Sequence, residues 1–319
     1  MVHNSVPKIY HSREEKELNT RYYSLSSWLK GLFAGPVRKV SVDAGLGCPN
    51  RPGGTGAGGC IYCNARGSGT GAHLLKTSVG EQLSQGISVL SQRYRVNMFI
   101  AYFQSYSNTY GSPLLLERLY REALSIPGVV GIAVGTRPDC VEDRTIDVLS
   151  ELKRDRLVWV ELGLQSMHKK TLRLINRGHD YMAFARTAER LMKKGIHVVA
   201  HLILGLPGES RSDMLLTART VSELGVDGIK LHPLYVVRGT PLEDLYRRGL
   251  YAPMTMEQSV NLTLDAVSFI SSRVVIHRLT SDPHREELVA PKWMLEKRAV
   301  RQLLEQTMEL TDFRQGWRL

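Results

Sequence analysis

Three of the four cysteines in this 319-residue chain lie close together, at Cys48, Cys60 and Cys63. Cysteines clustered in this way in an intracellular protein are more often metal ligands than disulfide partners. Their C-x11-C-x2-C spacing falls in a loop with nine glycines between Gly45 and Gly69. Glycine lets a backbone wrap a bulky group and turn its N–H groups toward sulfide and thiolate charge. Three thiolates on a 4Fe–4S cluster leave one iron open, where a small molecule can chelate.

Other chemistries remain open for these thiols. A zinc site would need a fourth ligand such as His73, although zinc ligands more often come as two short-spaced pairs. A redox C-x-x-C pair would need neither Cys48 nor the glycine-rich loop. The fourth cysteine, Cys140, follows Pro138 and Asp139 at the end of an apolar run, and we expect it to be a small buried residue rather than a ligand.

Six apolar, β-branched runs of strand length predict the elements that position this loop. They lie at 38–43, 97–103, 129–135, 157–164, 197–204 and 227–235. Helical patterns separate them at 79–94, 113–125, 143–153, 180–194 and 212–224. After the first strand, the strands start about every 28–40 residues, a spacing typical of βα units with right-handed crossovers. The sequence therefore predicts a parallel sheet with helices outside it.

Six βα units are fewer than the eight of a closed TIM barrel. Beyond them the pattern predicts a helix over 255–272, a short strand over 274–279 and a final helix over 291–309. We expect one α/β domain with two appendages. Its parts are an N-terminal extension over 1–37, a core over 38–252 and a C-terminal extension over 253–319.

The net charge of +11 comes mainly from two parts of the chain. Residues 1–100 carry 12 basic and 5 acidic groups, and residues 151–200 carry 11 and 5. Such a surplus could form one basic surface that suits a polyanion, although a raised pI also serves solubility alone. The basic side chains beside the motifs are Arg51, Arg66, Lys169, Lys170 and Arg173.

Targeting signals are missing from the sequence. No run of about 18 apolar residues occurs, so no membrane span is predicted. The N-terminal MVHNSVPKIYHSREEKEL lacks the apolar core of a secretory signal. We therefore expect a cytoplasmic protein.

Several motifs, in order along the chain, resemble the radical S-adenosylmethionine (SAM) superfamily. They are DAGLGCPNR, GGCIYCNARGSG, YFQSYSNTY, ELGLQS, LINRGHD, HLILGLPGE, LHPLYVVRGTPL and HREELVAPKW. The superfamily's usual spacing is C-x3-C-x2-C, and the wider spacing here is similar to the branch that contains the Elongator catalytic subunit. From about Tyr22 to Trp293 the chain most resembles the bacterial YhcC/YtqA-like family. This resemblance implies a partial (β/α)6 TIM-like barrel with the cluster loop after its first strand.

The resemblance also implies the cofactors. A 4Fe–4S cluster on the three clustered cysteines would pass one electron to SAM, supplied by a donor such as flavodoxin or ferredoxin. SAM would be cleaved to methionine and a 5′-deoxyadenosyl radical, which takes a hydrogen atom from the substrate. The protein would orient these groups and exclude water.

SAM contacts are expected at the C-terminal ends of the strands. By resemblance, Tyr62 would pack beside the adenine, and the backbone around Ile203 would flank it. Gln104 and Ser105 stand where the superfamily has Gly-Gly-Glu, so these residues or backbone groups would receive the methionine amine.

The fourth and fifth βα units supply further SAM candidates. Glu161 is a carboxylate in an apolar strand, where it needs a ligand or a cation. The resemblance implies the SAM ribose as its partner, with Gln165 on the same strand, and leaves the role of His201 open. Arg177 matches the position whose guanidinium reaches the SAM carboxylate, a natural bidentate pair.

Substrate candidates follow the sixth strand, and each could equally be hydrogen-bonded within the barrel. They are Lys230, His232, Tyr235 and Arg238. The C-terminal segment is expected to fold back over the open side of the barrel. Its candidates are His277, Arg278, Asp282 and Arg285.

The resemblance favours a transfer RNA (tRNA) substrate. Elongator-like relatives modify the wobble uridine, and the YtqA-type family is associated with converting 5-carboxymethylaminomethyl-uridine to 5-aminomethyl-uridine. The positive charge agrees, because phosphate contacts dominate RNA affinity and a single-stranded base can be flipped into a pocket. Radical SAM chemistry on a small molecule or peptide is the alternative, since LINRGHD is shared with a branch of porphyrin biosynthesis. A zinc-dependent RNA-binding module without catalysis is a third possibility.

Overall fold

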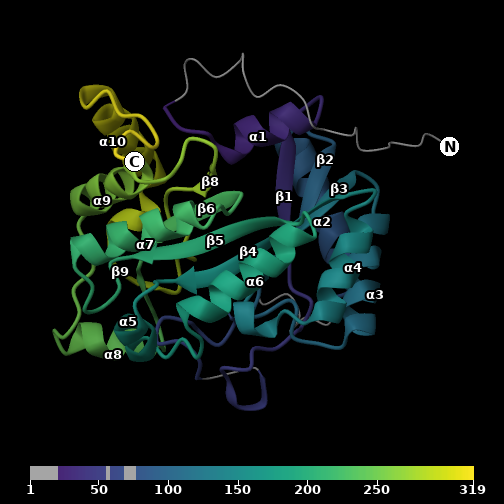
Figure 1. Cartoon of the computed structure of the whole chain (residues 1–319), viewed down its shortest axis with the longest axis horizontal. Helices are drawn as coiled ribbons and strands as arrows, with labels where there is room; N and C mark the ends of the chain where they lie inside the picture. Colours follow the sequence, from purple (N-terminus) through teal and green to yellow (C-terminus); the bar gives the residue numbers. More distant parts are fainter. Residues whose placement is uncertain (1–20, 55–57, 68–76) are drawn as a thin grey trace.

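The computed structural model describes residues 21–54, 58–67 and 77–319 of the chain. His73 and residues 1–20 of the N-terminal extension lie outside the described residues. The described part contains one curled, seven-stranded sheet in the order β1-β2-β3-β4-β5-β6-β8, in which every neighbouring pair is parallel (Figure 1). The predicted fold class, an open partial barrel, is confirmed.

The strands of this sheet match the six predicted runs and add a seventh. They are β1 (Val37–Val42), β2 (Met98–Phe103), β3 (Val129–Thr136), β4 (Leu157–Gln165), β5 (His197–Leu204), β6 (Gly228–Pro233) and β8 (Val275–Arg278). All nine residues of β4 are buried, as expected for a strand covered on both faces. The 274–279 run is therefore a sheet strand, paired with β6.

The strand predicted over 227–235 is shorter in the structure, which corrects the prediction. β6 ends at Pro233, and a separate antiparallel ladder joins β7 (Val236–Val237) to β9 (Leu288–Ala290). Proline has no N–H to donate to a ladder, so the strand ends there. The chain then turns away from the sheet, and C-terminal residues 288–290 come to lie beside the segment after β6.

Helices cover the outer face of the sheet (Figure 1). They are α2 (Val79–Tyr94), α3 (Pro113–Ser125), α4 (Asp143–Leu152), α6 (Tyr181–Lys193), α7 (Arg211–Glu223) and α9 (Met256–Ser268). The last helix, α10 (Lys297–Leu310), packs on α9. Two short helices, α5 (Lys169–Leu174) and α8 (Pro241–Arg247), lie near the C-terminal ends of the strands. Local signals fix the helix ends: Ser112 caps α3 with Pro113 in its first turn, and Gly195 follows α6 with φ 66°.

The inner face of the sheet has its own apolar layer. Ile100, Tyr102 and Trp159 pack there against Leu29 of α1 (Leu25–Leu32). Trp28 of α1 meets Trp159 edge-on, with ring centroids 5.9 Å apart. The amphipathic helix α1 thus closes the N-terminal end of the half-barrel. None of the helices in the described ranges combines the length and apolar character needed to cross a bilayer.

Candidate functional site

The cysteine loop follows β1 at the C-terminal end of the half-barrel. The Cys48 N–H donates to the Gly54 carbonyl at 2.6 Å, and the Cys63 N–H donates to the Cys60 carbonyl at 3.0 Å. Gly59 has φ 88°, a conformation that L residues rarely adopt. Within the described ranges, no three His, Cys, Asp or Glu side chains converge on a single metal position.

Guanidinium groups surround the thiols. Arg51 Nη2 lies 2.9 Å from Cys63 Sγ, and Arg177 Nη1 lies 3.5 Å from Cys60 Sγ. Burial raises the pKa of the Cys60 thiol, but the charge and hydrogen bond of Arg177 outweigh this effect, so the pKa is lowered. Burial raises the pKa of Cys140 to about 12, which keeps that thiol protonated. The electrostatic setting therefore favours the thiolate at Cys60 and not at Cys140.

The LINRGHD motif anchors the cysteine loop. Asn176 Nδ2 donates to the Gly59 carbonyl at 2.8 Å, and Asn50 Nδ2 donates back to the Asn176 carbonyl at 2.6 Å. The Ile61 N–H donates to the Ile175 carbonyl at 3.1 Å. These bonds place Arg177 beside the thiols.

Four predicted SAM residues carry buried polar atoms that lack a hydrogen-bond partner in the described part of the chain. These atoms are Tyr62 Oη, Ser105 Oγ, Gln165 Oε1 and Arg177 Nε. Gln165 also has φ 77°, an uncommon conformation for a residue other than glycine. Buried polar atoms are nearly always paired, so this concentration at the ends of β2 and β4 points to a ligand position.

The remaining predicted SAM residues lie at the same end of the sheet. Ile203 belongs to a small apolar cluster against which Tyr62 packs. Gln104 Oε1 accepts a hydrogen bond from Ser41 Oγ at 3.0 Å. Apolar side chains and unpaired polar atoms therefore lie at the same end of the sheet. SAM would need both, because its adenine is apolar on its faces and its methionine part is charged.

The Glu161 carboxylate, by contrast, already has hydrogen-bond partners within the chain. Its carboxylate accepts from Lys230 Nζ at 2.9 Å and from Trp159 Nε1 at 3.1 Å, and it lies 2.6 Å from His201 Nε2. Lys39 Nζ lies 3.7 Å away. The sequence required a ligand or a cation here, and the structure supplies cations. A contact with the SAM ribose stays a prediction.

Burial shifts the titration of this interior cluster. It lowers the pKa of Lys230 to about 7, although the Glu161 charge opposes the shift. Burial, together with the charge of Lys230, lowers the pKa of His201 to about 4. Burial raises the pKa of Glu161, but the charges of Lys230 and Lys39 outweigh it, so this pKa falls well below its usual value. Glu161 is therefore an ionised carboxylate inside the half-barrel.

The substrate candidates divide between interior and surface. His232 lies inside, with its ring 6.4 Å from that of His201. Tyr235 is partly buried and close enough to Arg278 for that charge to lower its pKa, although burial raises the pKa overall. Arg238 is exposed after β7, where its N–H donates to the Glu287 carbonyl at 2.9 Å. The structure thus brings Lys230, His232 and Tyr235 toward one space and leaves Arg238 outside it.

The basic surface predicted from the charge needs a correction. Arg51 is only 5% exposed and contacts Cys63, so it is not part of a surface that meets a polyanion. Arg66 is half exposed and pairs with Glu287 at 3.2 Å. Lys169, Lys170 and Arg173 do lie on the exposed face of α5.

Several site residues were not predicted from the sequence. They are Lys39 and Tyr102 inside the half-barrel, and Arg51 and Arg137 near the thiols. Lys39 and Tyr102 were detectable, because each is polar and faces inward from a mainly apolar strand. The role of Arg51 depends on how the loop folds, and spacing alone gives no signal of it.

Comparisons with known proteins agree with this geometry. The model of the radical SAM superfamily matches residues 45–221, and that of the radical SAM C-terminal domain matches residues 226–310. The chain belongs to the radical SAM superfamily. Uncharacterized protein YtqA of Bacillus subtilis is 36% identical over 93% of this chain and 92% of its own length. The resemblance to the YhcC/YtqA-like family is thereby confirmed.

Two further similarities concern one branch of the radical SAM superfamily. The tRNA uridine(34) acetyltransferase of Methanocaldococcus infernus is 30% identical over 48% of this chain and 29% of its own length. The solved structure of archaeal M. infernus Elp3 superposes with a TM-score of 0.68, at 19% identity, over 88% of this chain and 64% of that one. The latter likeness shows the fold alone.

This radical SAM chain has the side chains that its cofactors require. The superfamily uses a 4Fe–4S cluster and SAM, and both are cofactors of this chain. Arg51 contacts the Cys63 thiol, and Arg177 contacts the Cys60 thiol and favours its thiolate form. The unpaired atoms of Ser105, Gln165 and Arg177 offer an acceptor and donors for the polar end of SAM. We predict that Cys48, Cys60 and Cys63 hold the cluster.

Proposed function

We propose that this radical SAM enzyme acts on tRNA and converts 5-carboxymethylaminomethyl-uridine at the wobble position into 5-aminomethyl-uridine. The observation that carries the proposal is the similarity of half the chain to a tRNA uridine(34) acetyltransferase. The net charge of +11 supports it, because phosphate neutralisation supplies most non-specific nucleic-acid affinity.

The chain's own residues have distinct roles in this proposal. When bound, the cluster and SAM supply a radical that can take a hydrogen atom from an unactivated carbon. Arg177, Ser105 and Gln165 orient the polar end of SAM, and Tyr62 and Ile203 bound its adenine. The interior cluster around Glu161 lies next to the space into which a uridine side chain would project.

Nucleoside analysis of tRNA tests the proposal. A strain without this gene is expected to accumulate 5-carboxymethylaminomethyl-uridine and to lose nucleosides derived from 5-aminomethyl-uridine. Mass spectrometry of digested tRNA measures both. A plasmid copy of the wild-type gene should restore the profile, whereas a Cys60→Ala copy should not. An unchanged nucleoside profile in the deletion strain would reject the tRNA substrate and favour a small molecule or a peptide.

A further inference from the structure

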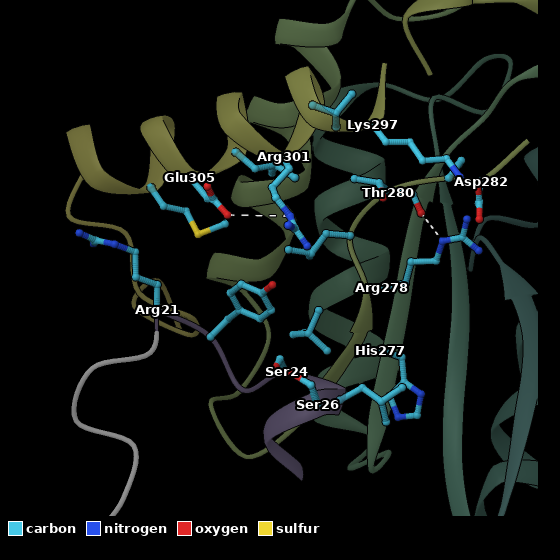
Figure 2. A pocket seen from close by; sticks show the side chains of 18 of the residues that line it. Arg21, Ser24, Ser26, His277, Arg278, Thr280, Asp282, Lys297, Arg301 and Glu305 are labelled. Atoms are coloured by element: carbon cyan, nitrogen blue, oxygen red, sulfur yellow. Dashed lines mark hydrogen bonds and ion pairs between the residues drawn. The ribbon is translucent and has the colours of Figure 1, made fainter. Parts of the chain in front are cut away.

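A large cavity lies at the open side of the half-barrel, between the edge strands β1 and β8. Its volume is about 1350 Å³, larger than most small-molecule sites. Residues of α1 and α10 complete the wall (Figure 2). None of the sequence motifs accounts for this cavity, although His277, Arg278 and Asp282, predicted to cover the open side, are among its lining residues.

The cavity is basic. Its described lining contains seven lysines and arginines and three carboxylates. Two carboxylates already have partners, since Asp282 pairs with Lys297, and Glu305 lies 4.0 Å from Arg301 (Figure 2). Arg38, Arg298 and Arg301 are exposed at the mouth. An anionic ligand would therefore gain several favourable charge interactions there.

The inner wall of the cavity reaches the polar interior of the half-barrel. Lys39 lines the cavity, and its Nζ lies 3.7 Å from the buried Glu161 carboxylate. Arg278 also lines it and is close enough to lower the pKa values of Lys230 and His232, which burial already depresses. A group that enters the cavity therefore approaches the substrate candidates inside.

The two ends of the half-barrel are covered by other elements. At the C-terminal end, the cysteine loop is hydrogen-bonded through Ile61 to Ile175 and Leu242, beside α5 and α8. At the N-terminal end, α1 packs on Trp159. Among the described residues, β1 and β8 are not paired with each other, and the side between them is an accessible route.

We propose that this cavity is the entrance by which one nucleotide of a single-stranded RNA loop reaches the barrel interior, while Arg38, Arg298 and Arg301 hold the flanking phosphates. The inference rests on the proposed function and names the surface that admits the RNA. A loop nucleotide suits the site because RNA readers bind unstacked bases in pockets and hold the backbone with cations. Its size and basic mouth fit a nucleotide with neighbouring phosphates better than an isolated base.

Matched charge reversals test the entrance. A fluorescent anticodon stem–loop RNA with uridine at the wobble position serves as probe, and anisotropy measures its binding to the cluster-loaded protein. The variant Arg298→Glu/Arg301→Glu is expected to bind at least ~10-fold more weakly, with a log–log salt slope smaller by about 0.7 per lost phosphate contact. The control Arg186→Glu/Lys193→Glu, on exposed positions of α6, changes the net charge equally and should bind as wild type.

A crosslink gives a second, independent readout. The same RNA with 4-thiouridine at the wobble position is irradiated with the wild-type protein, and adducts are mapped by mass spectrometry. Adducts on residues 275–282 or on α10 are expected. Adducts confined to α5, or equal losses of affinity in both charge-reversal variants, would overturn the entrance and leave the proposed function standing. If the wild-type protein does not bind the RNA, the proposed function fails, and the entrance fails with it.

Discussion

Two buried polar regions of this molecule differ in how their groups are paired. Inside the half-barrel, the fully buried Glu161 side chain contacts Trp159, His201 and Lys230. In the predicted SAM site, at the ends of β2 and β4, Ser105 and Gln165 are 1% and 9% exposed, yet Ser105 Oγ and Gln165 Oε1 have no partner in the described part of the chain. An unpaired buried polar group costs about 1–3 kcal/mol.

This difference separates a structural network from a binding site. The interior cluster is complete with the chain's own groups, so its loss should damage the folded state. The predicted SAM site is complete only with its cofactors, so changes there should affect binding and leave the fold largely intact.

The largest effect is expected at the cysteines. Replacing Cys48, Cys60 or Cys63 with alanine should remove the cluster and abolish SAM cleavage, because each thiolate holds a different iron. Iron content, visible absorbance and 5′-deoxyadenosine release measure the loss. The buried, protonated Cys140 provides the control, since Cys140→Ala should retain all three. Equal iron loss in all four variants would contradict the assignment.

The next largest effect is expected at Glu161. Glu161→Ala would leave Lys230 buried without its counter-charge, and removing one partner of a buried pair costs about 3–5 kcal/mol of stability. Urea denaturation of the cofactor-free protein measures this change. The double variant Glu161→Leu/Lys230→Met should recover much of the loss, because no unpaired charge remains. Normal stability of Glu161→Ala with a weakened SAM affinity would instead support the ribose contact.

The interior cluster also predicts a pH dependence. Because burial lowers the pKa of His201 from 6.5 to about 4, the folded state binds fewer protons than the unfolded state between these values. The stabilising contribution is therefore complete above about pH 6.5 and is lost as the pH falls toward 4. Urea denaturation across this range measures the slope.

A variant separates His201 from other groups that titrate there. The partly buried His232 and His277 also have lowered pKa values, mainly through desolvation, and contribute in the same direction. His201→Gln should reduce the slope without eliminating it. A slope identical to that of wild type would show that His201 is not held neutral by the cluster.

Much of the fold could be predicted from the sequence. The six strand runs are continuously apolar because both faces of a parallel sheet are covered, and this signal is local. The break at Pro233 was missed because the run stays apolar beyond it, even though the proline cannot donate to a ladder. The short strand β8 was found, but its pairing with β6 depends on contacts distant in sequence.

The site was predictable only where a residue type implies its chemistry. Spacing identified the cysteines, and the need of a buried carboxylate for a cation identified Glu161. Arg51 was counted among the basic side chains of a surface for a polyanion, yet it is buried against Cys63 because the loop folds back on itself. The basic cavity could not be predicted, since its arginines come from the segment before α1 and from β1, β8 and α10, which only the tertiary fold brings together.

The smallest effect is expected in the predicted SAM site. Ser105→Ala removes an unpaired buried hydroxyl, so the stability of the cofactor-free protein should stay the same or rise by up to about 1 kcal/mol. SAM affinity should fall by about 0.5–1.5 kcal/mol, the net value of one hydrogen bond, as measured by titration calorimetry. The matched control is Thr109→Val in the same loop, where Thr109 Oγ1 lies 2.6 Å from Thr136 Oγ1. Because that pair is complete without a ligand, Thr109→Val should lower stability and spare SAM binding. The opposite pattern, with Ser105→Ala destabilised and SAM affinity unchanged, would mean that the predicted SAM site is structural and would remove the distinction between the two regions.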